Sequence, residues 1–222
     1  MIKRNNMNNI IAFAGKMRSG KGVAAHCLED HYGYTYIEVA DKLKEICVEL
    51  IGLSGIDELN EYKNNGNTID LLFNFEVCNK LAELAEIPPE FVVKKMYGKH
   101  IVNVRVLLQM LGTDVLRAYN EDWHVYHLID KIMSLRKQNK PVVIGDVRFP
   151  NEKLTIEGIG GEVYYVEMKN YEIFNQHPSE SSLSVNDFDI DHVIYNEQMP
   201  KGNIDLFLYK VIDKLKKETD TK

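Results

Sequence analysis

The residues from 10 to 22, I-I-A-F-A-G-K-M-R-S-G-K-G, decide the fold of this chain. The apolar run predicts a buried strand, and the G-x-x-x-x-G-K sequence that follows it is typical of a phosphate-binding loop that leads into a helix. Glycines let backbone N–H groups face a phosphate chain, and Lys21 can reach the β and γ phosphates. The positive end of the following helix adds to the same anion site. The alternative is an ordinary glycine turn, which the flanking strand and helix disfavour.

One position departs from the usual loop. The Ser or Thr that normally follows the lysine as a Mg²⁺ ligand is Gly22. Because Mg²⁺ keeps several waters, the departure weakens the metal assignment and leaves the fold prediction unchanged. We predict that the nucleotide-binding residues are Gly15, Lys16, Ser19, Gly20, Lys21, Gly22 and Val23.

Composition limits the classes of function. The chain has 222 residues with 45% apolar and 27% charged residues, which is enough for one α/β domain with a buried core. A net charge of −6 argues against broad binding to nucleic acid or to anionic membranes. Three cysteines without C-x-x-C spacing predict neither a disulfide framework nor a zinc site. No apolar stretch has the length of a membrane span, and no signal-peptide core is seen, so we expect a cytoplasmic protein.

Strand and helix patterns alternate along the chain. We expect strands at 9–14, 34–39, 142–144, 162–168 and 192–195, and helices at 20–32, 42–50, 70–86, 90–97, 103–119, 122–138, 152–159 and 204–217. The polar stretch 53–67, rich in Asn and Gly, is expected to be a mobile loop. This order predicts a parallel sheet flanked by helices.

A second acidic position is expected at Asp146, which follows the buried run Val142–Ile144. A carboxylate at the end of such a strand can hold Mg²⁺ through water or accept a proton from an attacking oxygen. An aspartate that only caps the next turn is the alternative.

Arginine is scarce, with six residues against twenty-one lysines. Four of the six, Arg18, Arg105, Arg117 and Arg148, fall in segments expected to form the site. The planar guanidinium grips phosphate bidentately, and transfer between two anions needs such groups to offset repulsion. Arg105 and Arg117 could instead be solvated helix residues.

The segment from Val104 to Trp123 holds further candidates. Gln109 interrupts an apolar stripe, and its amide can bind the edge of a base. Trp123 can stack on a substrate or fill the core, and the core is favoured. The sequence H-P-S-E at 177–180 lies in the irregular stretch 170–187, which is either a closing lid or a mobile surface loop.

Several motifs together resemble those of the phage-type deoxynucleoside monophosphate kinases. They are G-K-M-R-S-G-K (15–21), A-D-K-L-K-E (40–45), R-V-L-L-Q-M-L-G-T-D (105–114), W (123), G-D-V-R-F-P-N-E (145–152) and H-P-S-E (177–180). They follow the family order over roughly residues 10–195. The resemblance implies a P-loop nucleoside monophosphate kinase fold with a core at about 8–52 and 140–222. A helical monophosphate-binding insertion at about 53–139 and a lid at 170–187 complete this single domain.

The resemblance also implies an activity and its cofactors. ATP with Mg²⁺ would donate a γ-phosphate to a deoxynucleoside monophosphate (dNMP), with Lys21, Arg18, Asp146 and Arg148 as the catalytic residues and Asp146 holding the metal through water. The implied substrate contacts are Lys42, Arg105, Gln109, Arg117, Trp123, Arg148, Glu152, Ser179 and Glu180.

Other functions stay open at this point. The animal phosphomevalonate kinases look similar in the same segments and are the runner-up for substrate. A P-loop ATPase or nucleotide-binding regulator would transfer no phosphate to a small acceptor. A GTPase is disfavoured because the chain has no N-K-x-D sequence. The expected partner is a small-molecule substrate, and the sequence does not decide whether the chain forms a homodimer.

Overall fold

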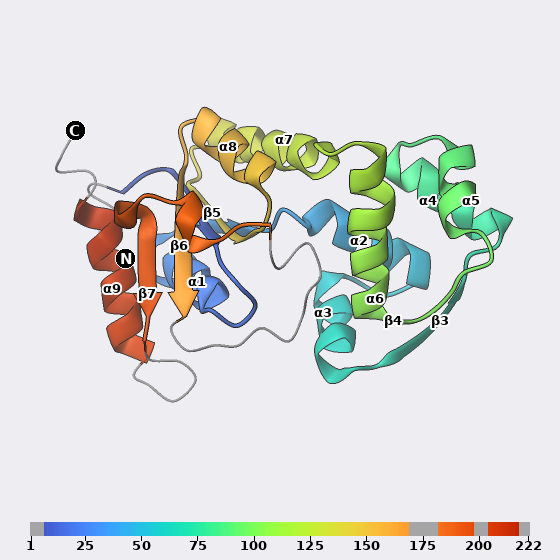
Figure 1. Ribbon diagram of the computed structural model, residues 1–222, viewed down its shortest axis with the longest axis horizontal. Coiled ribbons are helices and arrows are strands. Elements are labelled where there is room, and N and C mark those ends of the chain that lie inside the picture. Colours follow the sequence, from blue (N-terminus) through green and yellow to red (C-terminus); the bar gives the residue numbers. More distant parts are fainter. Residues whose placement is uncertain (1–6, 169–181, 198–203, 218–222) are drawn as a thin grey trace. The chain divides into compact units, whose positions relative to one another are not determined.

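A computed structural model describes residues 7–168, 182–197 and 204–217 (Figure 1). The chain divides into two compact units. The first unit combines Met1–Val39 with Leu128–Lys222, and the second is Ala40–His127. Each unit has its own hydrophobic core and is described by itself.

The first unit is built on a five-stranded parallel sheet in the order β2-β5-β1-β6-β7. The strands are β1 (Ile10–Ala14), β2 (Thr35–Ile37), β5 (Val142–Val147), β6 (Glu162–Met168) and β7 (Val193–Asn196). β1 is central, and all five of its residues are buried. Strands covered on both faces are expected to be continuously apolar, and this explains why β1 and β5 lack an alternating pattern.

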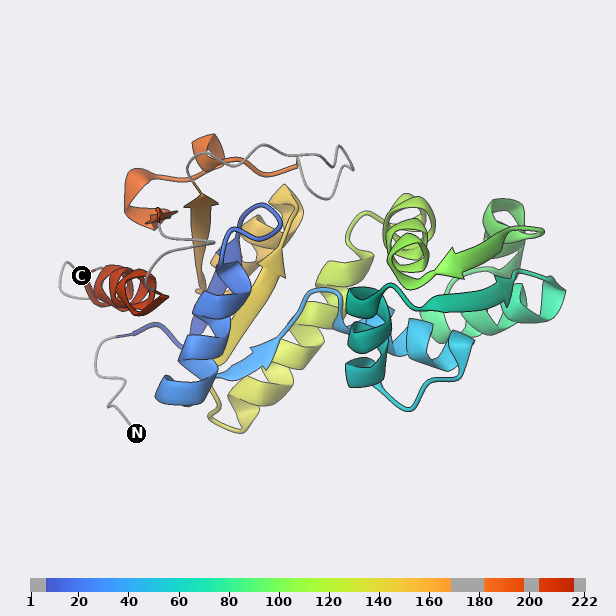
Figure 2. The same ribbon diagram turned by 90° about the horizontal axis from the view of Figure 1, so that it is seen from below.

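Helices cover both faces of this sheet (Figure 2). Ile11 and Phe13 of β1 pack with α1 (Lys21–Tyr32) and α9 (Ile204–Lys217). The alternate residues of β1, Ile10, Ala12 and Ala14, pack on the other face with α8 (Pro150–Gly158) and with α7 (Trp123–Lys137) from Leu128 onward. Two short 3₁₀ helices, Val185–Asp187 and Ile190–His192, precede β7. The parallel sheet flanked by helices that the sequence predicted is confirmed.

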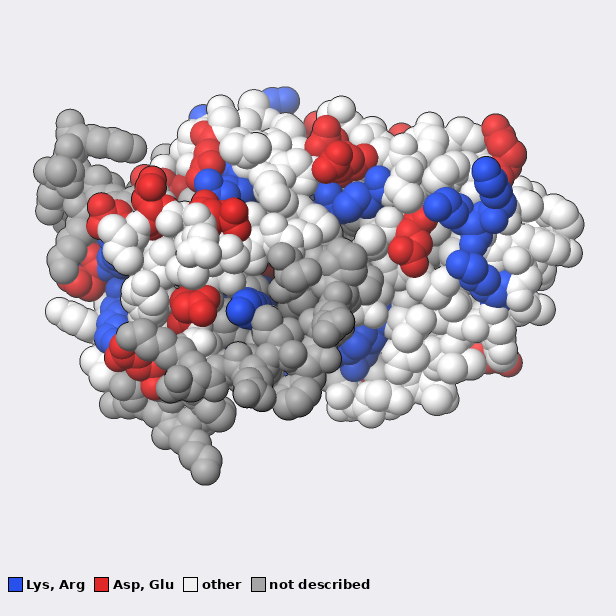
Figure 3. Space-filling view, viewed as in Figure 1, with Lys and Arg blue, Asp and Glu red and all other residues white. Residues whose placement is uncertain are grey.

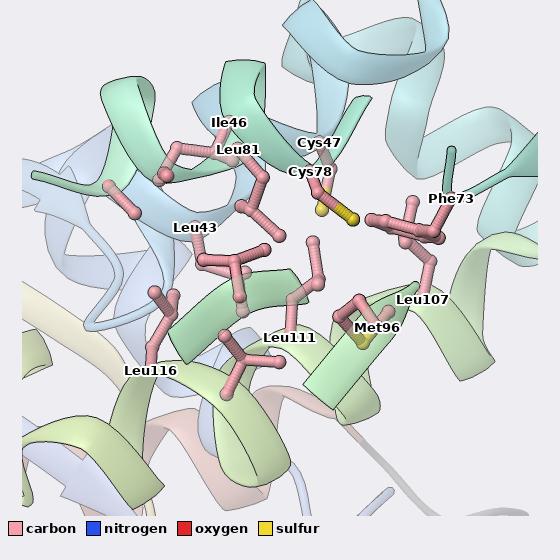
Figure 4. Close-up of a cluster of buried hydrophobic side chains, with 14 of the residues drawn as sticks. Leu43, Ile46, Cys47, Phe73, Cys78, Leu81, Met96, Leu107, Leu111 and Leu116 are labelled. Atoms are coloured by element: carbon pink, nitrogen blue, oxygen red, sulfur yellow. The ribbon is translucent and has the colours of Figure 1, made fainter. Parts of the chain in front are cut away.

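The second unit is mainly helical. Its elements are α2 (Asp41–Ile51), α3 (Ile56–Asn65), β3 (Thr68–Leu72), α4 (Phe75–Ala85), α5 (Pro89–Met96), β4 (His100–Asn103), α6 (Val104–Gln109) and the π-helix η1 (Met110–Arg117). Side chains from α2, α4, α5, α6 and η1 converge in one core, which includes the buried Phe73 and the free cysteines Cys47 and Cys78 (Figure 4). We expected this insertion at 53–139. The unit instead begins before α2, because α2 packs against α3, α4 and α6.

Two expectations for this unit are wrong. The stretch 53–67 is not an irregular loop, because α3 occupies most of it and is anchored by the buried Leu59. Asn64 and Asn65 form the last turn of the helix, Gly66 caps it with a φ of 69°, and Gly55 precedes its first residue. The helix expected at 70–86 begins only at Phe75, because residues 68–72 form β3, whose buried Leu71 pairs with Ile101 of the antiparallel β4.

The helix expected at 103–119 changes its winding. Asn103 caps α6 as predicted, since its side chain accepts hydrogen bonds from the N–H groups of Arg105 and Val106. From Met110 the helix becomes the π-helix η1, a winding that frees backbone carbonyls from the α-helical pattern. Nε2 of His124 lies 3.1 Å from the carbonyl oxygen of Gly112 and donates to it. This bond holds η1 against the start of α7.

His124 is buried in an uncharged form. Burial lowers its pKa to about 4; the positive charge of Arg117 acts in the same direction, and the bond to the Gly112 carbonyl opposes it. Nδ1 of the ring has no hydrogen-bond partner among the described residues. The neutral imidazole with its proton on Nε2 is therefore the form that the fold requires.

We predict that this histidine makes the fold sensitive to acid. Between the unfolded pKa of about 6.5 and the folded value of about 4, the unfolded state binds the extra proton. Stability is therefore full above pH 6.5 and falls as the pH is lowered toward 4, by about 2–3 kcal/mol. His124→Gln keeps an N–H donor but does not titrate, so urea unfolding of this variant should lose less stability over that pH range. His26→Gln, at an exposed position, serves as the control. Equal pH dependence of His124→Gln and the parent would contradict the assignment.

Candidate functional site

The loop after β1 has the geometry of a phosphate cradle. Gly15 and Gly20 have φ values of 143° and 106°, in the region that favours glycine, and α1 begins at Lys21 immediately afterward. A Cβ atom on Gly15 would lie 2.6 Å from the carbonyl oxygen of Val166 in β6, and one on Gly20 would lie 2.7 Å from Nδ2 of Asn196. Both glycines are therefore fixed by neighbouring strands as well as by backbone conformation.

Side chains hold the loop in this shape. Nζ of Lys21 donates to the carbonyl oxygen of Lys16 at 3.1 Å, and only 9% of this residue is exposed. Nδ2 of Asn196, at the end of β7, donates to the carbonyl oxygen of Ser19 at 2.8 Å. Sequence reasoning missed Asn196, whose only signal was its position at the end of an apolar strand. The hydroxyl of Ser19 is buried and has no hydrogen-bond partner among the described residues. The exposed Arg18 lies at the loop tip with a φ of 65°.

Asp146 lies beside this loop, at the carboxyl end of β5. β5 is the neighbour of β1 in the sheet, and Val147 pairs with Ala14, the residue before Gly15. Oδ1 of Asp146 accepts a hydrogen bond of 2.7 Å from the N–H of Val39. The carboxylate is thus buried at the carboxyl ends of the strands, where ligands bind in open parallel sheets.

Arg148 and Glu152 follow on the same side of the sheet. The Glu152 carboxylate accepts hydrogen bonds from the N–H groups of Arg148 at 2.8 Å and of Phe149 at 3.1 Å, and it caps α8. Only 2% of Glu152 is exposed. We predicted Glu152 as a substrate contact, whereas its position is that of a structural cap that orders the turn carrying Arg148. The half-buried Arg148 directly follows β5.

Most of the other predicted substrate residues belong to the second unit. Arg105 and Gln109 are four residues apart on α6 and so share one face of that helix, with Arg105 exposed and Gln109 half-buried. Lys42 is half-buried in the first turn of α2. Nη1 of Arg117, at the end of η1, donates to the carbonyl oxygen of Glu121 at 3.0 Å.

Trp123 is a core residue. Its indole N–H donates to the carbonyl oxygen of Ala85 at 3.0 Å, and its side chain packs into the core of the second unit. This is the alternative that the sequence favoured over substrate stacking. Ser179 and Glu180, together with most of the expected lid at 170–187, lie outside the described residues.

The groups around this loop are suited to bind a nucleotide together with a cation. Three features favour a phosphate chain: the space left by the two glycines, the buried Lys21 and the N-terminus of α1. No group of three His, Cys, Asp or Glu side chains within the described residues could hold a metal ion alone. A cation here would therefore take most of its ligands from phosphate oxygens and water, as Mg²⁺ commonly does.

Figure 3 shows described basic and acidic side chains interspersed on the left of the view, whereas several basic side chains gather on the right. Within the described ranges, none of the helices is both long and apolar enough to cross a membrane.

The chain was compared with known proteins. The family model of deoxynucleotide monophosphate kinases matches residues 55–205. A protein of Acanthamoeba polyphaga mimivirus, named provisionally as a deoxynucleotide monophosphate kinase, is 29% identical over 192 residues, which are 82% of this chain and 86% of that protein. A solved structure of dephospho-CoA kinase from Campylobacter jejuni matches 97% of this chain and 99% of its own, with a TM-score of 0.49 and 13% identity.

The family match covers more than half of the chain and includes the segment from Gly145 to Glu152 and the helix that carries Arg105 and Gln109. It agrees with the expectation drawn from those motifs. The chain belongs to the deoxynucleotide monophosphate kinase family, and it is a phosphotransferase that acts on nucleotides.

Proposed function

We propose that this enzyme transfers the γ-phosphate of ATP to a deoxynucleoside monophosphate and releases ADP and the deoxynucleoside diphosphate. The observation that carries the proposal is the loop from Gly15 to Lys21, held open at the end of the central strand in a member of this family. The family match favours a nucleotide acceptor over phosphomevalonate.

In the proposed reaction, an oxygen of the acceptor phosphate forms a bond to the γ-phosphorus, and the bond to the β,γ-bridging oxygen breaks. The acceptor oxygen is already anionic, so no general base is required. The loop N–H groups and Lys21 would bind the β and γ phosphates, and Arg18 would offset charge on the transferred group. A Mg²⁺ ion bound with ATP would supply further charge neutralisation, with Asp146 holding one of its waters.

In this proposal, cationic side chains would bind the acceptor phosphate, and an amide would contact its base. Arg148 is the strongest candidate for the acceptor phosphate, because Glu152 fixes the backbone from which it projects. We propose Arg105 as a second phosphate contact, with Lys42 and Arg117 as further cations. Gln109, on the same face of α6 as Arg105, is the candidate for contact with the base.

Lys21 is the cation of the loop that we expect to bind the transferred phosphate. Lys21→Ala should lower kcat/KM by about 10²–10⁴, or roughly 3–5 kcal/mol, because the variant loses a cation that binds the transferred group. Product formation from ATP and a dNMP would be measured in coupled and direct assays. Lys153→Ala is a suitable control, since Lys153 forms a partly buried ion pair with Glu157 on α8. Near-normal turnover of Lys21→Ala would reject the assigned role.

The acceptor is tested with a substrate panel. Each dNMP, each ribonucleoside monophosphate and phosphomevalonate would be incubated with ATP, and both ADP and the new phosphorylated product would be quantified. We expect ADP formation to depend on a dNMP and to match the deoxynucleoside diphosphate formed. ADP release at an equal rate without any acceptor would identify an ATPase and refute the proposal.

The next prediction separates the two substrates. Arg148→Lys should raise KM for the dNMP by about 10–100-fold, because lysine keeps the charge and loses the bidentate fork. KM for ATP should change little. Arg136→Lys is the matched control, since Arg136 is in the last turn of α7 and contacts the carbonyl oxygen of Ile159. A change in KM for ATP alone would show that Arg148 does not bind the acceptor.

A further inference from the structure

Open space lies beside Gly22. This glycine lies in the first turn of α1, where P-loops place the hydroxyl that binds Mg²⁺. A Cβ atom built on Gly22 would meet nothing within 4 Å, and its φ is not in the positive region. Neither crowding nor backbone conformation therefore requires glycine here. The position is open, so another element could supply an oxygen ligand in place of the missing hydroxyl.

The packing of α1 against β2 shows which element faces this space. The ring of His26 on α1 stacks on the ring of Tyr36 on β2, with centroids 4.4 Å apart. α1 connects β1 to β2, two parallel strands that are separated in the sheet by β5, so it runs opposite to the strands. Gly22 precedes His26 by four residues, which is about 6 Å along the helix axis, and it lies on the same helix face. Glu38 directly follows the last residue of β2, about 7 Å beyond Tyr36, and its carboxylate lies on the same side as the Tyr36 hydroxyl. Glu38 is thus at the level of Gly22.

The structure also shows how Glu38 is held. The hydroxyl of Tyr36 donates to Oε1 of Glu38 at 2.8 Å. The ring of Tyr36 in turn lies over Gly145, where a Cβ atom would be 2.6 Å from the ring. Gly145 directly precedes Asp146, and Asp146 accepts a hydrogen bond from Val39, the residue after Glu38. Two carboxylates therefore lie at the carboxyl ends of the neighbouring strands β2 and β5, beside the phosphate cradle.

We propose that Glu38 is a ligand of the divalent cation that accompanies ATP and that it takes the place of the hydroxyl missing at Gly22. This inference rests on the proposed function, since it assumes that the loop binds ATP. Glu38 would coordinate the cation from β2, Asp146 would bind one of its waters from β5, and the phosphates would supply further oxygens. A carboxylate oxygen is a ligand that Mg²⁺ and Mn²⁺ both accept.

The test measures metal binding without turnover. Mn²⁺ would be titrated into the protein with a non-hydrolysable ATP analogue and no acceptor, and free Mn²⁺ would be followed by electron paramagnetic resonance. Glu38→Gln should weaken Mn²⁺ binding by roughly 10–100-fold. Binding of the analogue without metal should stay equal or become tighter, because one negative charge near the phosphates is removed. Glu29→Gln is the control, as Glu29 bonds to His26 on the surface of α1.

A second variant tests whether the Glu38 carboxylate takes the place of the hydroxyl missing at Gly22. Glu38→Gln combined with Gly22→Ser should recover much of the lost Mn²⁺ affinity, because the open space at Gly22 admits a hydroxyl. A role of Glu38 limited to folding predicts no such rescue. Unchanged Mn²⁺ affinity in Glu38→Gln would overturn the inference. The inference would also fail if this variant bound the ATP analogue more weakly by the same factor with and without Mn²⁺. If the parent protein binds neither the analogue nor its Mn²⁺ complex, the proposed function itself fails.

Discussion

The close approach of β6 to Gly15 is the constraint on which the site depends. The carbonyl oxygen of Val166 occupies the space that a side chain at Gly15 would fill, so the chain can turn away from β1 only through a glycine. The central position of β1 brings β5 to its other side, and the sheet then places Asp146 next to the loop. Asn196, at the end of β7, fixes the loop carbonyl of Ser19 from a third strand. The phosphate cradle is therefore a product of the whole parallel sheet.

Sequence patterns predicted elements well where one periodicity governed a segment. The strand at 162–168 and the helix at 204–217 have the expected bounds, because the strand has a buried run at 163–166 and the helix has a clear apolar stripe. Sequence patterns did not predict the elements that few residues stabilise. α3 depends on the single buried Leu59, and its Asn-rich end resembles a loop. β3 exists through its pairing with β4, about thirty residues away, and no local pattern contains that partner.

Site residues were predictable to the extent that a motif carried them. The loop from Gly15 to Gly22 is such a motif, and it lies at the end of β1 as expected. Glu152 was part of a motif too, but the motif did not reveal that its carboxylate caps α8. Asn196 and Glu38 belong to no motif. Asn196 reaches the loop, and Glu38 lies at the same end of the sheet, because β7 and β2 are parallel to β1, and that arrangement is a property of the sheet order.

A carboxylate in place of a hydroxyl would change more than the identity of one ligand. A hydroxyl is neutral, whereas Glu38 and Asp146 would together place two negative charges beside a donor that is itself an anion. Lys21, Arg18 and the N-terminus of α1 offset part of that charge, but the repulsion between the carboxylates and metal-free ATP would remain. Only the ATP–cation complex removes it, because the cation lies between the carboxylates and the phosphates. A site of this kind would therefore select the metal complex of the donor over the free nucleotide, in a chain whose overall charge is already −6.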